Sequence, residues 1–322
     1  ANTEKVYATI NGKANDSQLC FSSGEMFRLI ESYITDNFGE KGKFRFVIAP
    51  DDTPYACTCP SCTAIGNTEK NATPAVTELI LRLSQRFPRH FFFTTSYLTT
   101  QQVTDKQLPP NAGVIVSAIN FPLRRIDGKD AKEKAFAGQL EQWKNVTKNI
   151  YIWDYINNFD DYLTPMPILK IARQRLQFFK QHGASGIFFN GSGYSYSSFD
   201  EMRTFVLSAL LINPELSVDN LTASFFNQEY PAAKKWLYDY YTDLENGTQS
   251  GKRLGIYASI RESEKAYLTP EKFIKFYDEM NDFVSNAKGK ERKKLHELQT
   301  ALSYTRMEMG REHSFDAYGY AK

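Results

Sequence analysis

The sequence lacks a hydrophobic run long enough to cross a bilayer. Its longest apolar stretch covers residues 205–212, whereas a membrane-spanning helix needs about 20 residues. Nothing at Ala1 has the pattern of a signal peptide, and because the chain starts with Ala instead of Met, either a leader has been removed or the chain was cut from a longer one. We expect no membrane span, and further modules of a longer chain are among the expected partners.

An excess of charge of either sign is also missing. The chain has 39 Lys and Arg residues against 37 Asp and Glu residues, a net charge of +2, which gives no reason to expect nucleic acid or an anionic membrane as a partner. Its 322 residues, 42% of them hydrophobic, can bury a large core in one barrel-sized domain or two smaller ones. The aromatic content of 14% fits a carbohydrate-active protein and a Phe-rich core equally well.

Histidine is scarce, and phosphate-binding loops are absent from the sequence. None of the four histidines stands near a plausible nucleophile, so a serine triad is poorly supported. No Gly-rich phosphate loop precedes an expected helix. We therefore expect no catalytic cofactor.

Cysteine is rare as well, but the few cysteines are crowded. Three of the four fall at Cys57, Cys59 and Cys62, with Cys20 upstream. A structural zinc site would use these residue types, and in an oxidising compartment the same even number could form two disulfides. Redox catalysis is disfavoured because no thioredoxin-like βαβ context surrounds the motif. The sequence does not choose between a zinc site and two disulfides.

Apolar strand patterns alternate with helical patterns through the first two thirds of the chain. Strands are expected at 44–49, 91–97, 113–119, 150–155 and 186–190, with a sixth at 5–10 if that segment counts. Ser22 with Glu25 and Ser198 with Glu201 form capping boxes that open two of the helices. This alternation indicates a parallel sheet wrapped by helices. Because a closed (β/α) barrel needs eight strands, we predict α/β architecture with a partial, TIM-like barrel over 1–216, its first units lying upstream of Ala1.

The sequence pattern changes at Ser217, after which only helical patterns follow. The segment from Pro270 to Val284 carries a strong amphipathic stripe. Such stripes are packing faces far more often than cofactor sites, so we predict a helical C-terminal region over 217–322 that packs on the barrel.

The segment 150–167 carries the richest chemistry. A short apolar strand runs into carboxylates, carboxamides and aromatic rings before Pro165 and Pro167 end it. Parallel sheets bind ligands at the carboxyl ends of their strands, where flat rings suit a pyranose and Asp or Asn suits its hydroxyls. The expected sugar contacts are Tyr97, Trp153, Tyr155, Asn158, Tyr162 and Asn190. The alternative is that Trp153 and Tyr155 belong to the core.

Carboxylates also follow two of the expected strands. Asp51 and Asp52 come after the strand at 44–49, and Asp154 lies about one hundred residues later. A parallel sheet would bring them to one rim, and glycoside hydrolysis needs two carboxyl groups in different protonation states. We predict Asp52 and Asp154 as the catalytic pair. Capping of turns around the cysteine loop explains Asp51 and Asp52 equally well.

The block 151–167, the segment Gln18 to Cys20, the loop 52–62 and the segment Leu210 to Pro214 together resemble the bacterial domain of unknown function 4838 family. That resemblance implies a likeness to barrel glycoside hydrolases of the hexosaminidase and α-glucuronidase type in polysaccharide-utilisation proteins of gut bacteria. It also implies an oligosaccharide or polysaccharide ligand and a secreted, periplasmic or cell-surface location.

One departure from the family pattern bears on catalysis. Family members often carry a Glu after the strand that ends here in Phe189 and Asn190. If that Glu is an acid in active relatives, this chain has lost hydrolysis and kept sugar binding. The sequence therefore leaves two readings, a glycoside hydrolase and a non-catalytic carbohydrate-binding or structural module.

Overall fold

The computed structural model describes residues 6–191, 197–248 and 251–318, with side chains described up to His313. The chain forms two compact units. Unit 1 contains Ala1–Asn120, Lys134–Asp154 and Lys180–Phe188, and unit 2 contains Phe121–Glu133, Tyr155–Phe179 and Phe189–Lys322. These units divide the chain differently from the predicted boundary after residue 216, which stays a prediction.

The main sheet has five parallel strands that curl like part of a barrel. Its order is β3-β4-β5-β6-β7, so spatial order follows chain order. The strands are β3 (Arg45–Val47), β4 (Phe91–Ser96), β5 (Ala112–Ser117), β6 (Ile150–Tyr155) and β7 (Gly186–Asn190). The five predicted strands are thus confirmed. The described residues form an open sheet, and a complete barrel is not among them.

The expected sixth strand lies in a separate sheet. Strand β1 (Tyr7–Ile10) pairs antiparallel with β2 (Lys13–Leu19), and the two form their own two-stranded sheet. Asn11 and Gly12 make the turn, both with positive φ (51° and 74°), as expected of the mirror-image turns that join tight hairpins. Counting residues 5–10 toward the parallel sheet was therefore wrong, because their partner is the next segment of the chain.

Four helices belong to unit 1, namely α1 (Gly24–Phe38), α2 (Pro60–Ile65), α3 (Thr73–Arg86) and α4 (Ala131–Lys144) for the most part. The capping residue of α1 is Ser23, whose hydroxyl accepts a hydrogen bond from the N–H of Met26. The prediction of Ser22 in that role was wrong by one residue. Helix α3 opens with Pro74 in its first turn, where a missing N–H costs nothing.

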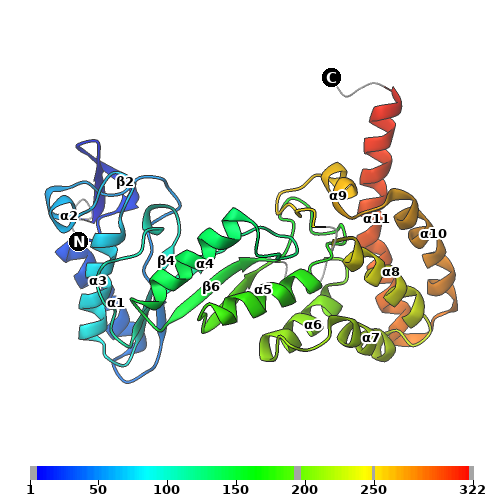
Figure 1. The fold of residues 1–322 in the computed structure, drawn as a ribbon, viewed down its shortest axis with the longest axis horizontal. Helices are drawn as coiled ribbons and strands as arrows, with labels where there is room; N and C mark the ends of the chain where they lie inside the picture. The colour runs from blue at the N-terminus through cyan, green and yellow to red at the C-terminus, as the bar shows by residue number, and fades with distance from the viewer. Residues whose placement is uncertain (1–5, 192–196, 249–250, 319–322) are drawn as a thin grey trace. The chain divides into compact units, whose positions relative to one another are not determined.

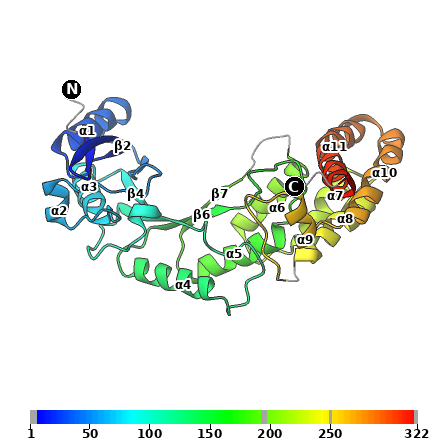
Figure 2. The ribbon, with the colours of Figure 1, turned by 90° about the horizontal axis from the view of Figure 1, so that it is seen from above.

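One face of the sheet is covered by helices of unit 1. Trp143 on α4 donates its indole N–H to the hydroxyl of Ser96 at the end of β4 (3.3 Å), and α4 runs along one side of β6 in two views (Figures 1 and 2). The core of this unit joins the β1–β2 hairpin to α1, α3 and β4 through buried residues such as Ala8, Ile34, Leu79 and Phe92. The sheet therefore has one buried face.

Unit 2 is mainly helical. Its helices are α5 (Leu169–Gln181, most of it), α6 (Asp200–Ile212), α7 (Val218–Glu229), α8 (Lys234–Gly247), α9 (Ile260–Ala266), α10 (Pro270–Asn286) and α11 (Gly289–Tyr318). The residue that caps α6 is Phe199, in the left-handed conformation and without a side-chain hydrogen bond. The predicted Ser198 capping box was wrong because the helix starts one residue later.

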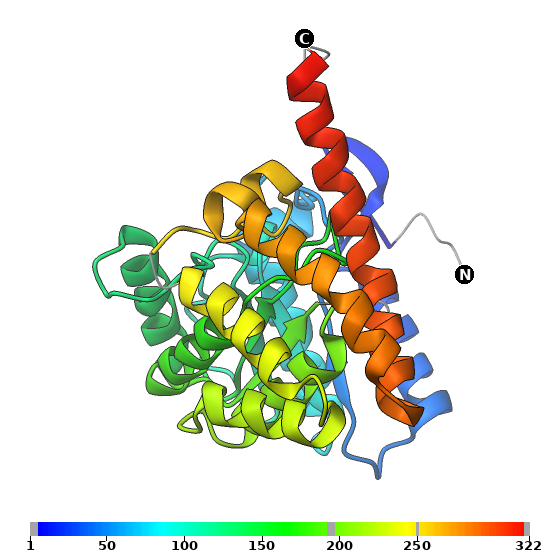
Figure 3. The ribbon, with the colours of Figure 1, turned by 90° about the vertical axis from the view of Figure 1, so that its right-hand side faces the viewer.

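The predicted helical C-terminal region is present. Helices α10 and α11 lie side by side (Figure 3), and the ring of Trp236 on α8 stacks on Phe276 and on Phe283, each at 4.3 Å between centroids. The amphipathic stripe of α10 is thus a packing face, as the sequence indicated. Within the described parts of the chain, no helix combines the length and the apolar character that a membrane span requires.

Candidate functional site

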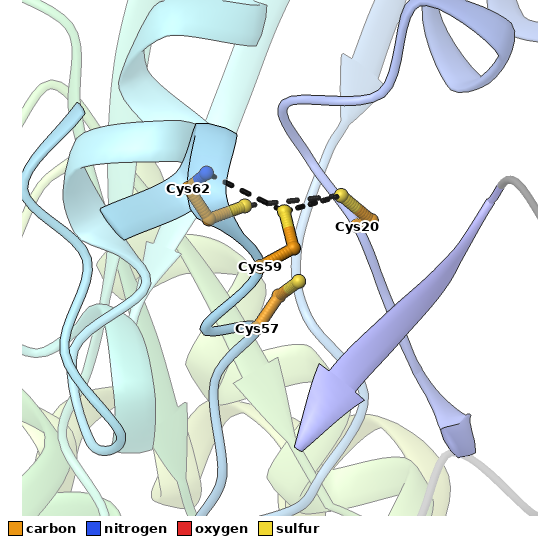
Figure 4. A group of neighbouring side chains, drawn as sticks. All are labelled: Cys20, Cys57, Cys59 and Cys62. Atoms are coloured by element: carbon orange, nitrogen blue, oxygen red, sulfur yellow. Dashed lines mark hydrogen bonds between the residues drawn. The ribbon is translucent and has the colours of Figure 1, made fainter. Parts of the chain in front are cut away.

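Four cysteines from three segments of unit 1 converge on one point (Figure 4). Cys20 follows β2, Cys57 and Cys59 lie in the loop after β3, and Cys62 lies in α2. Their sulfur atoms all lie within 4.8 Å of one another. Cys20 Sγ is 3.7 Å from Cys59 Sγ and 3.8 Å from Cys62 Sγ. Three of the side chains are buried and Cys59 is half-buried.

Polar groups around the cluster point hydrogens at the sulfurs. The N–H of Thr9 donates to Cys57 Sγ (3.2 Å) and the N–H of Cys62 donates to Cys59 Sγ (3.4 Å). The Ser22 hydroxyl lies 3.1 Å from Cys62 Sγ. Hydrogen bonds with Cys20 and then Cys62 lower the pKa of Cys57, whereas hydrogen bonds with Cys20 and then Cys57, followed by burial, raise the pKa of Cys62. The pKa of Cys57 and the pKa of Cys62 therefore shift in opposite directions within one hydrogen-bonded cluster.

This arrangement has the donor set and the spacing of a metal site. All four cysteines are free, and thiolate sulfur is a ligand that binds soft and borderline metal ions. The cluster can hold one metal ion. The sequence had indicated these four residues, and the structure brings Cys20 to the other three in one closed group.

A second feature of unit 1 is the sheet face opposite α4, on which β6 and β7 keep accessible surface among the described residues; we call it the uncovered face. Along β6 burial alternates, so that Ile150, Ile152 and Asp154 are buried whereas Tyr151 and Trp153 are half-buried. Successive residues of a strand point to opposite faces, so the two aromatic side chains share the uncovered face. On β7 the exposed residue is Phe188, with 57% of its surface accessible.

Aromatic rings on this face lie across neighbouring strands. Phe93 stacks on Tyr151 with 4.9 Å between centroids, and Trp153 meets Phe188 edge-to-face at 5.8 Å. Gly113 and Gly186 make room for this. A Cβ at Gly113 would come within 2.7 Å of the Phe93 ring, and one at Gly186 would come within 2.9 Å of the Tyr151 ring. We call Phe93, Tyr151, Trp153 and Phe188 the aromatic row.

The two predicted catalytic carboxylates lie in different surroundings. Asp52 is exposed in the loop after β3, whereas Asp154 is fully buried. Because Asp154 lies inside β6 and alternates with Trp153, its side chain points to the sheet face opposite the aromatic row. The strand runs on to Tyr155, so Trp153 and Asp154 lie within the sheet. The sequence had suggested a position where the chain leaves the sheet.

The loop that carries Asp52 is fixed by a buried side chain. Gln18 is 1% exposed, and its Nε2 donates to the Thr53 hydroxyl (3.1 Å) and to the carbonyl oxygen of Asp51 (3.3 Å). In return, the N–H of Asp51 donates to Gln18 Oε1 (3.2 Å). The β1–β2 hairpin therefore shapes the exit of β3.

A comparison with families of known proteins matches residues 3–243 to the family described as Domain of unknown function (DUF4838). The chain belongs to the DUF4838 family. The predicted family is thereby confirmed, and the match includes every strand described above, the cysteine cluster and the aromatic row. No curated protein matches the chain. Helices α9, α10 and α11 lie beyond the part matched to DUF4838.

Several predicted sugar contacts of the DUF4838 chain belong to unit 2. Tyr155 and Tyr162 both meet Phe159 edge-to-face, each at 6.0 Å between centroids, and Tyr257 lies 5.9 Å from the same ring. Tyr257 is 60% exposed. Around the central ring of Phe159, these side chains form a second aromatic cluster, which we call the Phe159 cluster.

The remaining predicted residues take part in hydrogen bonds with backbone groups. Asn158 is buried, and its side-chain amide pairs with Ala258, accepting from its N–H (3.0 Å) and donating to its carbonyl oxygen (2.7 Å). The carbonyl oxygen of Asn190 accepts the N–H of Ile156 (3.0 Å). Tyr97 is half-buried where β4 ends, and its carbonyl oxygen accepts the N–H of Thr100 (2.9 Å).

The prediction missed three members of the aromatic row, namely Phe93, Tyr151 and Phe188. A period-two reading of Ile150 to Tyr155 would have found Tyr151, because it alternates with buried isoleucines in the same way as Trp153. Phe188 gives a weaker signal, since its strand is short and apolar except for Asn190 at its end.

Proposed function

We propose that this DUF4838 protein acts on glycans and contacts sugar through the aromatic row of its parallel sheet. The observation that carries the proposal is the combination of Trp153, half-buried, with Phe188, 57% exposed, on the uncovered face. Rings that keep accessible surface on a rigid strand are suited to packing against the apolar face of a pyranose.

A buried ring packs beneath part of the aromatic row. Phe93 is 2% exposed and stacks on Tyr151, so the partly exposed rings are held in place before any ligand arrives. Preorganisation of this kind lowers the entropy lost on binding. Ser117 pairs with Trp153 in the register of β5 and β6 and is half-buried, which places a hydroxyl beside the indole for hydrogen bonding to a sugar.

The Phe159 cluster supports a second sugar contact in unit 2. Tyr257 is exposed and lines a surface cavity of about 470 Å³ together with Lys252, Arg253 and Glu262. Tyrosine hydroxyls and charged side chains around an apolar ring are the groups that recognise oligosaccharides. We assign the predicted contacts Tyr155 and Tyr162 to this cluster.

Sugar binding is better supported than hydrolysis that uses Asp52 and Asp154 as the catalytic pair. A general acid must reach the glycosidic oxygen, and Asp154 is fully buried on the helix-covered side of β6. The resemblance to family members that often carry a Glu where this chain has Phe189 and Asn190 supports the same choice. A hydrolase related to barrel glycosidases of gut bacteria, secreted or periplasmic where polysaccharides are met, is the alternative form of the same proposal.

The experiment compares glycan binding by the full chain and three variants. Soluble polysaccharides and oligosaccharides are screened by affinity electrophoresis and calorimetry, first with the unmodified protein. Trp153→Ala and Phe188→Ala should weaken binding about tenfold, a loss of about 1.4 kcal/mol. Tyr33→Ala is the matched control, because Tyr33 is 59% exposed in the same unit but lies on α1.

Three outcomes decide between the readings. Equal binding by all variants would contradict the aromatic row as the sugar contact. Release of aryl glycosides that Asp52→Asn and Asp154→Asn both abolish would establish the hydrolase. Loss of stability without any glycan binding would assign the row to packing against further strands, and the protein to a structural role.

A further inference from the structure

We infer that Cys20, Cys57, Cys59 and Cys62 bind one Zn²⁺ ion as a closed, purely structural tetrathiolate site. The inference concerns unit 1 alone and is independent of glycan binding. It rests on the distances between the sulfurs, on the donors around them and on the segments that they join.

The sulfur spacing matches a single tetrahedral ion. Four sulfurs at about 2.3 Å from a central zinc lie about 3.8 Å apart from one another. Cys20 Sγ lies 3.7 Å from Cys59 Sγ and 3.8 Å from Cys62 Sγ, and the whole set falls within 4.8 Å. A disulfide needs about 2.05 Å, and its formation would leave the other two sulfurs to pair with each other in the same small volume.

Charge balance requires the cation. Binding converts four thiols into four thiolates, four Zn–S bonds form, and four protons leave to solvent, so the site carries a net charge of −2. Without the ion, four thiolates held within 4.8 Å of one another would repel each other. The N–H groups of Thr9 and Cys62 point at sulfur, which is the outer support that thiolate ligands require.

All four positions of the ion are occupied by protein. A catalytic zinc keeps a position for water or substrate, whereas a tetrathiolate does not. Three of the four cysteine side chains are also buried. The site therefore holds structure and does not activate a substrate.

The ion would connect segments that also share buried packing and hydrogen bonds. Cys20 ends the β1–β2 hairpin, and the other ligands lie in the loop and short helix 57–62. Between hairpin and loop, the N–H of Thr58 donates to the carbonyl oxygen of Thr9 (2.8 Å), and Gln18 binds the segment 51–55. Zinc thus fixes the exit of β3, where Asp52 lies.

The test uses the full chain, purified without added metal, with metal content measured by mass spectrometry. We expect one zinc per chain. Cys20→Ser and Cys62→Ser should reduce it below one tenth of that, whereas Ser22→Ala, which removes a neighbouring hydroxyl but no ligand, should retain it. Replacement of zinc by Co²⁺ should give the intense visible bands of a tetrahedral site and thiolate-to-metal charge transfer in the near ultraviolet.

A chelator titration keeps the test independent of how well the variants fold. Removal of zinc from the unmodified protein should lower its Tm by about 5 °C or more, and zinc should restore it. Protein that contains no zinc, or that contains iron in its place, would overturn the inference, as would two disulfides in freshly purified protein. Glycan binding is measured separately, so failure of one proposal leaves the other testable.

Discussion

The ring of Tyr151 lies over the backbone of Gly186 on the neighbouring strand. A Cβ at position 186 would come within 2.9 Å of two ring carbons, and Tyr151 is itself stacked on Phe93. The ring cannot retreat without disturbing that stack. The lack of a side chain at Gly186 is therefore a condition for the aromatic row.

Alanine substitutions at three glycines should separate close packing from backbone freedom. At Gly113 a Cβ would meet the carbonyl oxygen of Asn149 at 2.3 Å, whereas at Gly138, inside α4, nothing lies within 4 Å. Overpacking costs about 1–3 kcal/mol, and Gly→Ala in an unobstructed helix gains about 0.5–1 kcal/mol. We expect Gly113→Ala to destabilise most, Gly186→Ala less, and Gly138→Ala to stabilise. Urea unfolding followed by circular dichroism gives the order, and equal effects would contradict it.

The sequence was sufficient to predict the parallel strands because each is a short apolar or aromatic run between breakers. Phe91–Ser96 follows Pro88, and Ile150–Tyr155 follows Lys148 and Asn149. Strands predicted from such local patterns are present in the structure. The same period-two logic, applied within 150–155, places Asp154 with the buried isoleucines. We had predicted that Asp154 and Trp153 lie together because both are near the end of the strand. That prediction did not consider that successive residues point to opposite faces of the sheet.

Pairings between distant segments were harder to predict. Whether Tyr7–Ile10 joins the parallel sheet or a hairpin depends on Lys13–Leu19, a segment whose polar residues give no strong strand signal. The approach of Cys20 to Cys59 depends on that hairpin. Tertiary contacts therefore bring the four sulfurs together, which composition alone could not show.

Replacement of Asn158 by Ala should loosen the segment 252–258. Its side chain makes two hydrogen bonds to Ala258 in a buried site, and loss of both leaves the Ala258 backbone groups unsatisfied, at a cost of about 2 kcal/mol. Limited proteolysis should show faster cleavage near Ile256. Asn37→Ala is the control, since Asn37 makes an exposed hydrogen bond to Tyr33, and unchanged cleavage in Asn158→Ala would refute the assignment.

Substitutions at Asp52 and Asp154 should affect different properties. Asp154 is fully buried, so Asp154→Ala should lower the free energy of unfolding by about 1–3 kcal/mol, with glycan binding retained by the folded fraction. Asp52 is exposed, so Asp52→Ala should change stability by less than about 0.5 kcal/mol. Denaturant midpoints and calorimetric binding measure both properties. A stable Asp154→Asn variant that loses a measured hydrolytic activity would instead support the catalytic pair.

The buried carboxylate of Glu245 should make unit 2 less stable as pH rises. Glu245 accepts the N–H groups of Leu169 (2.8 Å) and Lys170 (3.0 Å) at the start of α5, but burial, the largest effect, raises its pKa above the usual value. The folded state thus holds the proton more tightly than the unfolded chain does. Its contribution is fully present below the unfolded pKa, about 4.3, and is lost as pH rises toward the folded pKa.

Glu245→Gln isolates this effect because glutamine keeps an acceptor oxygen and does not titrate. We expect the free energy of unfolding of the unmodified protein, measured relative to that of Glu245→Gln, to fall as pH increases from about 4.3. Guanidinium unfolding at several pH values, followed by tryptophan fluorescence, measures the difference. A difference that rises with pH would mean that the two N–H donors outweigh burial and that the folded carboxylate is stabilised in its charged form.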